Sequence, residues 1–346
     1  MKNYSFPIIT FLTGLVVLLS SCEKEKGISP SNIDCSEAIL FNSKEIKKQG
    51  QNFNISVKVG NEIKVLVEDA DYDFWWARLH PDKTKFLCYR SPVGDNKEDN
   101  DYSRAELWQF NTDGTDGKKL IDLEDHAWHA QGVADWSPDG NHIVMIAELA
   151  EDNNKPNNRY FQLVRTDSDG SNPKQLTSGP GLRADPSWSP DGNQIIYVAF
   201  PEDYDPQNLI LDILFQGPLE VHIADISNNG NLSNIRQLTD DNIRDNDPYM
   251  APDGSYIAWE SFVNGAGVIR AYDIDEQKIS ILVERGELPC CPSYYEDPDK
   301  FLIHSLKLLV DPFYIAEYDR NTDSYKAVIK DKDHAYINPQ WVCWPN

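Results

Sequence analysis

Hydrophobic residues in this chain gather in short runs, each bounded by polar turn residues. Five such runs follow one another at wide intervals, at residues 85–89, 142–147, 194–200, 256–262 and 300–304. They are rich in Ile, Val, Tyr and Phe, a composition typical of β-strands. The pattern predicts an all-β protein.

A recurring tight-turn motif precedes these runs. The copies are Leu79-His80-Pro81-Asp82-Lys83, Trp136-Ser137-Pro138-Asp139-Gly140, Trp188-Ser189-Pro190-Asp191-Gly192, Met250-Ala251-Pro252-Asp253-Gly254 and a looser Asp297-Pro298-Asp299-Lys300. Pro fixes φ at the first corner, Asp can bond its own backbone and Gly accepts a positive φ. The turn prolines lie 57, 52, 62 and 46 residues apart, near the repeat length of β-propeller blades.

Two more strand-like runs complete each repeat. The third runs are 106–110, 160–165, 220–224, 268–272 and 313–318, and the fourth are 119–123, 174–177, 236–239, 279–283 and 325–329. Together with the strand that ends in the turn motif, each repeat has four strands. Four strands make one blade of a β-propeller.

A sixth blade is split between the two ends of the chain. A truncated motif, Asn338-Pro339-Gln340-Trp341, begins one last strand, and three unassigned runs at 38–41, 54–59 and 62–67 precede the first turn motif. One strand plus three completes a six-bladed ring and removes its open edges. This closure brings Cys35 and Cys343 together, and a disulfide there would contribute about 5 kcal/mol in the chain-entropy model. The alternative is two unpaired thiols.

The remaining cysteines are read as structural. Cys88 alternates with Phe86 and is expected to pack in the core. Cys290 and Cys291 are adjacent, so they form either a vicinal disulfide or two small buried residues.

The segment Asp185-Pro186-Ser187-Trp188-Ser189-Pro190-Asp191-Gly192 and its copies resemble the TolB-type propeller repeat. Lys174-Gln175-Leu176-Thr177 and Arg236-Gln237-Leu238-Thr239 extend the resemblance, which covers residues 35–346. It implies a six-bladed β-propeller. It does not imply one function, because this fold carries binding, lyase and hydrolase-associated roles.

The N-terminus resembles a bacterial lipoprotein signal. The apolar run 6–19 is too short to span a membrane and ends in Leu19-Ser20-Ser21-Cys22. We expect residues 1–21 to be a signal peptide, Cys22 to be lipidated, residues 22–34 to form a tether, and the protein to sit at the outer membrane of a bacterial envelope, on its periplasmic face or the cell surface. An ordinary signal peptide that contains a cysteine is the alternative.

The formal net charge of −24 narrows the range of partners. Such a surface repels nucleic acid and anionic lipid headgroups. The expected contact with the membrane is therefore through the N-terminal lipid alone, and the expected partner of a monomeric propeller is an envelope protein or a glycan.

Binding residues are expected on the face formed by the loops that lead into the innermost strands, here called the loop face. They are Trp75, His126, Trp128, His129, Gln131, Arg183, Arg244, Asp245, His334 and Tyr336. Among them, His129 and His334 each lie seven residues before a motif tryptophan. An apolar insert in the third repeat offers Leu211, Leu214 and Phe215 for docking a partner, or for covering its own blade.

Three functions remain open. The preferred hypothesis is a non-enzymatic binding or scaffold module without a cofactor. The alternative is a divalent-metal polysaccharide lyase of the oligogalacturonate type, in which the resemblance would place Mn, Ca or Zn at His129 and His334, with His126 and Gln131 nearby. The third is a structural subunit of an envelope complex. The sequence lacks a Gly-x-Ser-x-Gly elbow, a phosphate loop and a His-Glu-x-x-His motif.

Overall fold

The computed structural model describes residues 35–46, 52–93, 104–126, 128–149, 160–179, 181–201, 204, 217–294, 296–307 and 312–345. The chain divides into two units, Met1–Asn32 and Ile33–Asn346, and only the second contains described residues. The expected signal peptide, lipidated Cys22 and tether lie outside this part, as do Leu211, Leu214 and Phe215. No helix among the described residues is long and apolar enough to cross a membrane.

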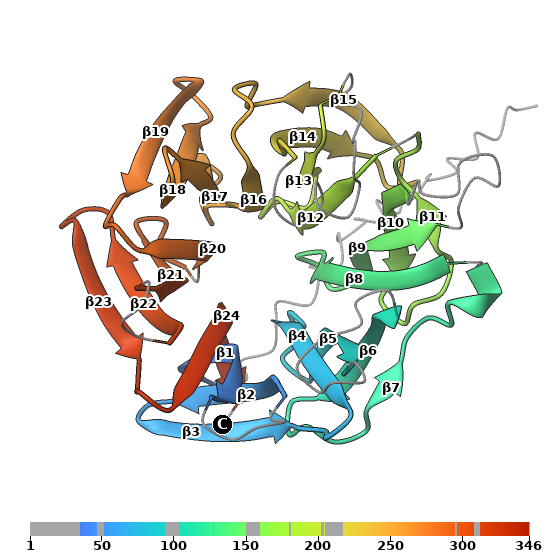
Figure 1. The fold of residues 1–346 in the computed structure, drawn as a ribbon. Helices are drawn as coiled ribbons and strands as arrows, with labels where there is room; N and C mark the ends of the chain where they lie inside the picture. Colours follow the sequence, from blue (N-terminus) through green and yellow to red (C-terminus); the bar gives the residue numbers. More distant parts are fainter. Residues whose placement is uncertain are drawn as a thin grey trace, which may run out of the picture. The chain divides into compact units, whose positions relative to one another are not determined.

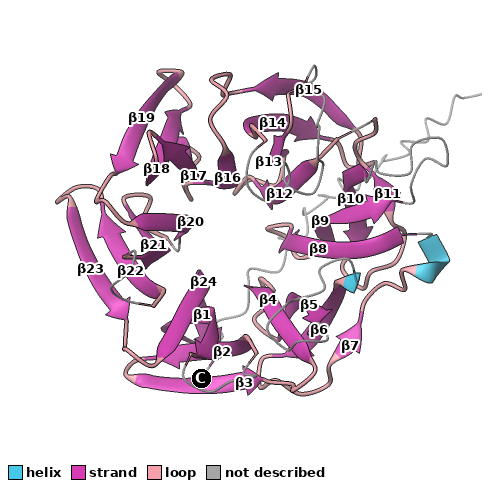
Figure 2. Ribbon diagram, in the orientation of Figure 1, coloured by secondary structure: helices cyan, strands magenta, loops and turns pink. Residues whose placement is uncertain are grey.

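The described residues form six four-stranded antiparallel sheets arranged as blades around a centre (Figure 1). Strands and loops make up almost all of the described chain, and the short 3-10 helix η2 (Glu124–His126) lies before the second blade (Figure 2). The predicted six-bladed β-propeller is therefore confirmed.

The first three blades follow the chain directly. Blade one is β4 (Tyr72–Leu79), β5 (Lys85–Pro92), β6 (Glu106–Asn111) and β7 (Lys118–Lys119); blade two is β8 (Trp128–Trp136), β9 (His142–Leu149), β10 (Tyr160–Asp167) and β11 (Lys174–Gln175); blade three is β12 (Arg183–Trp188), β13 (Gln194–Ala199), β14 (Glu220–Ile226) and β15 (Leu232–Gln237). The outer strands β7 and β11 are only two residues long, shorter than the sequence predicted.

The other blades close the ring. Blade four is β16 (Asp245–Met250), β17 (Tyr256–Val263), β18 (Ala266–Asp273) and β19 (Lys278–Val283); blade five is β20 (Leu288–Tyr294), β21 (Lys300–Leu306), β22 (Tyr314–Asp319) and β23 (Ser324–Ile329); blade six is β24 (His334–Pro345), β1 (Cys35–Glu45), β2 (Asn54–Val59) and β3 (Glu62–Val67). The C-terminal strand β24 thus pairs with β1 and completes one sheet with the three N-terminal strands, as predicted.

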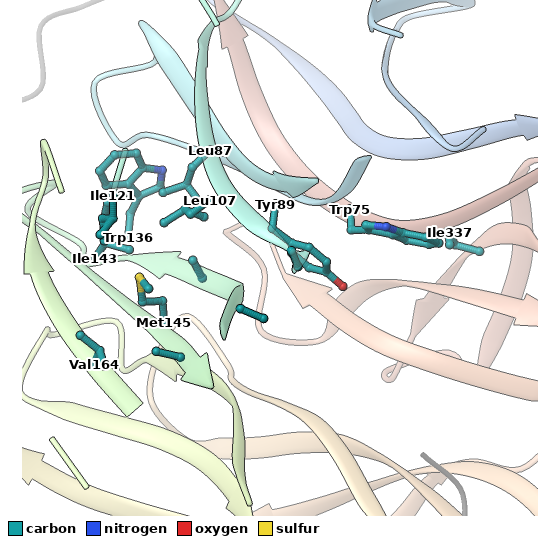
Figure 3. Close-up of a cluster of buried hydrophobic side chains, with 14 residues drawn as sticks. Trp75, Leu87, Tyr89, Leu107, Ile121, Trp136, Ile143, Met145, Val164 and Ile337 are labelled. Carbon is teal, nitrogen blue, oxygen red and sulfur yellow. The ribbon is translucent and has the colours of Figure 1, made fainter. Parts of the chain in front are cut away.

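Each pair of neighbouring blades shares a separate hydrophobic cluster, six in all among the described residues. Figure 3 shows the cluster between blades one and two, in which Leu87 and Leu107 lie beside Trp136, while Trp75 lies next to Ile337. Apolar side chains on the two sheet faces supply these clusters, since successive side chains of a strand point to opposite sides. No blade has an independent core, so each is stabilised by its two neighbours.

The turn motif works as its residues predict. Gly140 and Gly192 have φ of 72° and 73°. Asp191 Oδ1 accepts hydrogen bonds from the Ser189 hydroxyl (2.6 Å) and the Asn193 N–H (3.1 Å). The hydrogen bond from Ser189 lowers the pKa of the Asp191 carboxyl even though partial burial acts against it. The end of the propeller that carries these turns is here called the turn face.

A disulfide joins Cys35 to Cys343 across the closing pair of strands, with 5.5 Å between their Cα atoms. Of the other described cysteines, Cys88, Cys290 and Cys291 are free thiols. Cys88 is fully buried, and burial raises the pKa of its thiol, in keeping with the expected core role.

We predict that the double variant Cys35→Ser/Cys343→Ser loses up to about 5 kcal/mol of unfolding free energy, because the disulfide closes almost the whole propeller into one loop. Denaturant titration of the oxidised protein and the variant measures the difference. Reductant should destabilise the parent and leave the variant unchanged. An equal midpoint for the two oxidised proteins would contradict the expectation.

Candidate binding site

The six innermost strands, β4, β8, β12, β16, β20 and β24, line the centre of the ring (Figure 1). Each carries one non-glycine residue with a positive φ, three residues before Leu79, Trp136, Trp188, Met250, Tyr294 or Trp341. These residues are Trp76, Val133, Asp185, Asp247, Cys291 and Asn338, with φ between 21° and 59°. In every case the pairing register with the next strand shifts at this place, so each innermost strand has a β-bulge.

The bulges connect successive blades around the channel. Asp185 Oδ2 accepts a hydrogen bond from the Asp247 N–H (3.3 Å), and Asp247 Oδ2 lies 3.1 Å from the Cys291 sulfur. On the other side, Asn42 Oδ1 accepts from the Asn338 side-chain amide and from the Trp76 N–H, both at 3.3 Å. A bulge can redirect a side chain, and here these contacts follow the ring from blade three to blade one.

A second set of contacts lies two residues further along. Gln340, Ser293 and Asp135 each stand two positions after a bulge residue. Their side chains accept hydrogen bonds from the backbone N–H of Leu79 (2.7 Å), Trp341 (3.2 Å) and Trp188 (3.2 Å), each in the next blade. Backbone groups that a bulge leaves unpaired are thereby satisfied by a neighbouring blade.

One pair of side chains crosses the channel. Arg78 Nε donates to the Tyr249 hydroxyl at 3.0 Å, and Nη2 contacts the same oxygen. Arg78 is on β4 and Tyr249 on β16, in blades one and four, which are on opposite sides of the ring (Figure 1). Burial opposes the charge, but Tyr249 and Asp135 raise the pKa of the Arg78 guanidinium. This pair is called the crossbar below.

A recess of about 310 Å³ lies on the turn-face side of the crossbar. All six innermost strands contribute to its lining, which includes Arg78, Asp135, Trp188, Tyr249, Tyr294 and Gln340. Aromatic rings beside an arginine and a carboxylate combine apolar contact area with polar groups of both signs. The recess can therefore hold a group with both apolar and polar parts.

A second recess, of about 500 Å³, runs between blades two and three on the same face. Pro138 and Trp188 line both recesses, so the two are contiguous. His142, Arg165 and Asp191 are among the other lining residues. The two recesses therefore lie side by side, one at the axis and one between blades two and three.

Acidic groups and thiols cluster on the channel wall. Donor atoms of Asp247, Glu260 and Cys290 lie within 4.8 Å of one another, as do those of Cys290, Cys291 and His304.

Burial and the neighbouring Asp247 raise the pKa of Asp185 to about 7. Burial and Glu260 raise the pKa of Asp247 to about 6, and burial raises the pKa of Glu260 to about 7. Arg244 and Arg78 are nearby cations for this acidic group.

The sequence did not identify this cluster as a site. A usable signal exists, because four of the six bulge residues precede proline, in Asp185-Pro186, Asp247-Pro248, Cys291-Pro292 and Asn338-Pro339. Aligning the repeats on these dipeptides places the four side chains at one level of the channel.

Four of the predicted binding residues are used inside the fold. Trp75 is 8% exposed, and its indole N–H donates to Ser91. The Gln131 side chain accepts from the Leu107 N–H. Asp245 is fully buried and accepts from Ser261, and the Tyr336 hydroxyl donates to Asp331. These hydrogen bonds are made within the fold.

The other predicted residues are more accessible. His126 and His129 are exposed, while Trp128, Arg183, Arg244 and His334 are partly exposed. The His126 and Trp128 rings lie 4.8 Å apart, and His334 Nδ1 lies 3.1 Å from Asp331. Arg244 Nη1 donates to the Gly217 carbonyl at 3.1 Å.

The structure does not bring His129 and His334 into a common group of metal donors. Three groups with ligand atoms within 4.8 Å exist among the described residues, and none contains His126, His129 or His334. The two histidines occupy equivalent places in blades two and six, with blade one between them. The third group, Glu220, Asp241 and Asp245, already holds the Arg270 guanidinium, at 2.5 Å from Asp241 and 3.5 Å from Asp245.

We predict that Tyr249→Phe lowers the unfolding free energy by about 1.5–3 kcal/mol, because the variant leaves the buried Arg78 without one hydrogen-bond acceptor. Urea unfolding of Arg78→Met, Tyr249→Phe and the double variant measures the coupling. The double variant should lose less than the sum of the single losses, since each substitution removes the partner that the other would leave unsatisfied. Additive losses would show that the crossbar contributes nothing.

Comparison with known proteins supports the fold assignment. No family model matches the chain. An uncharacterized protein of Agrobacterium fabrum, Atu1656, is 26% identical over 100 residues, which are 28% of this chain and 33% of that relative's length.

Solved structures are similar over most of the chain. TolB from Acinetobacter baumannii has a TM-score of 0.65 at 14% identity, over 90% of this chain and 68% of its own. Hydrazine synthase of Kuenenia stuttgartiensis has a TM-score of 0.67 at 14% identity, over 90% of this chain and 48% of its own. An oligogalacturonate lyase of Vibrio parahaemolyticus has a TM-score of 0.53 at 13% identity, over 81% of this chain and 72% of its own. The chain therefore has the fold of the TolB-like six-bladed β-propellers.

Proposed function

We propose that this protein is a lipid-anchored binding or scaffold module of the bacterial envelope, whose propeller takes a protein or glycan partner on its turn face. The observation that carries the proposal is the pair of contiguous recesses that share Pro138 and Trp188. Their walls belong to strands that are fixed to one another by the contacts between blades. A rigid, pre-formed surface loses little conformational entropy when a ligand binds.

The turn face replaces the loop face as the proposed binding surface. On the loop face, Gln131 and Tyr336 already have partners inside the fold. On the turn face, Trp188, Tyr294 and Arg78 line a recess of about 310 Å³. Aromatic side chains of this kind suit either an extended peptide or a sugar chain.

We prefer the binding role to the lyase alternative. The comparison that supports that alternative is the oligogalacturonate lyase of similar fold. Gln131, which the resemblance would place near a metal, instead holds the backbone of Leu107. His129 and His334 belong to none of the metal-donor groups of the described residues.

The anchor is tested by Cys22→Ser. We expect the variant to leave the membrane fraction of the native bacterium, because Cys22 is the proposed site of the lipid. Ser20→Ala, which keeps the cysteine, should stay with the membrane. Retention of Cys22→Ser in that fraction would refute the lipid anchor.

The binding surface is tested by Met250→Arg, which adds a long charged side chain at the half-buried lining of the axial recess. Proximity labelling in cells identifies the partner, and the affinity of the purified partner or glycan is then measured. We expect Met250→Arg to weaken binding at least about tenfold, or about 1.4 kcal/mol.

Ile235→Arg is the matched control, because Ile235 is 55% exposed on the outer strand β15 and lines neither recess. It should bind like the parent. Equal affinity of Met250→Arg and the parent would place the partner elsewhere on the molecule.

A further inference from the structure

The vicinal cysteines of β20 point in an unusual direction for neighbours in a strand. Successive side chains of a regular strand face opposite sides of the sheet. Cys291 has a φ of 59° at the bulge, and both sulfurs lie near one atom, Asp247 Oδ2, at 3.6 Å for Cys290 and 3.1 Å for Cys291. The bulge therefore turns two thiols toward one carboxylate of the neighbouring blade.

A second carboxylate completes the group. The donor atoms of Glu260, Asp247 and Cys290 lie within 4.8 Å of one another. Glu260 is on β17, Asp247 on β16 and the cysteines on β20, so the group joins blades four and five. Cys290 thus lies in one group with both carboxylates, and Cys291 adjoins that group through Asp247.

His304 is also near the thiols, but its ring is already engaged. Its Nδ1 accepts a hydrogen bond from the Asn338 N–H at 3.1 Å. A ring that accepts a hydrogen bond at Nδ1 carries its proton on Nε2. Neither nitrogen has a free lone pair, which excludes His304 from the donor set.

We propose that Cys290, Cys291, Asp247 and Glu260 form a binding site for a zinc-type divalent cation. Two sulfurs select a borderline-soft metal over calcium or magnesium, which prefer oxygen ligands alone. Four donors match the tetrahedral preference of Zn²⁺. Each thiol releases its proton to solvent as its sulfur binds the ion.

The site would act as a link between blades. A cation here adds positive charge to an acidic group whose neighbouring cations are Arg244 and Arg78. It also connects β16, β17 and β20, whose blades otherwise meet through the apolar cluster of Tyr256, Ile269 and Phe301. This role is independent of the partner proposed for the turn face.

The test uses the full-length chain, purified in detergent, treated with a chelator under nitrogen, and titrated with Zn²⁺ alone and with Co²⁺ alone. We expect one ion per chain. Cobalt should give the intense charge-transfer absorption of a thiolate complex. Zinc should protect Cys290 and Cys291 from alkylation, as measured by peptide mass spectrometry.

Three variants locate the ion. Cys290→Ser/Cys291→Ser should lose the cobalt absorption, and Asp247→Asn should weaken binding at least about tenfold. Cys88→Ser, which removes a thiol in blade one, and His129→Ala/His334→Ala should both keep one ion per chain. If Cys290→Ser/Cys291→Ser does not fold, protection of the parent thiols from alkylation decides the matter.

Several results would overturn the proposal. These are the absence of a thiolate band in the parent, its persistence in Cys290→Ser/Cys291→Ser, and a Cys290–Cys291 disulfide in protein purified under nitrogen. Loss of the ion from His129→Ala/His334→Ala would move the site to the loop face and favour the lyase alternative.

Discussion

Closure of the ring by β24 and β1 is the constraint on which the rest of this structure depends. These strands come from opposite ends of the chain, pair antiparallel, and carry the Cys35–Cys343 disulfide. Without this pairing, blade six would lose its innermost strand and blades one and five would each lose a packing partner. Because every apolar cluster lies between two blades, opening the ring at one place exposes hydrophobic surface on both sides of the gap.

Closure also explains why the channel can hold strained and polar residues. Six non-glycine residues with positive φ cost of order 1–3 kcal/mol each, and such residues persist only where the surroundings fix them. Here the fixing comes from the next blade, through hydrogen bonds such as those that Asp185 and Asn42 accept. At Cys291 the strained backbone directs both thiols of the Cys290–Cys291 pair toward the carboxylate of Asp247.

The sequence predicted the architecture well because the architecture is repeated. The turn motif around Asp139, Asp191 and Asp253 marks each blade, and the unassigned runs at 54–59 and 62–67 match β2 and β3. The site was harder to predict, because it depends on which side chains meet across blades. His129 and His334 occupy equivalent positions, yet a whole blade separates them, so equivalence in the repeat did not produce proximity. The recesses depend on how Trp188 and Pro138 pack against neighbours distant in sequence, and no local pattern encodes that packing.

The disulfide has a mechanical consequence as well. Any tension that residues 1–34 transmit to the propeller arrives at Cys35, the first residue of β1. In a ring closed only by backbone hydrogen bonds, such a pull could peel β1 from β24 one pair at a time. The covalent bond to Cys343 lies at the point where the load enters, so the force passes into both strands at once. A force applied at Cys35 is therefore resisted by β1 and β24 together, and the closing pair of strands is protected against separation.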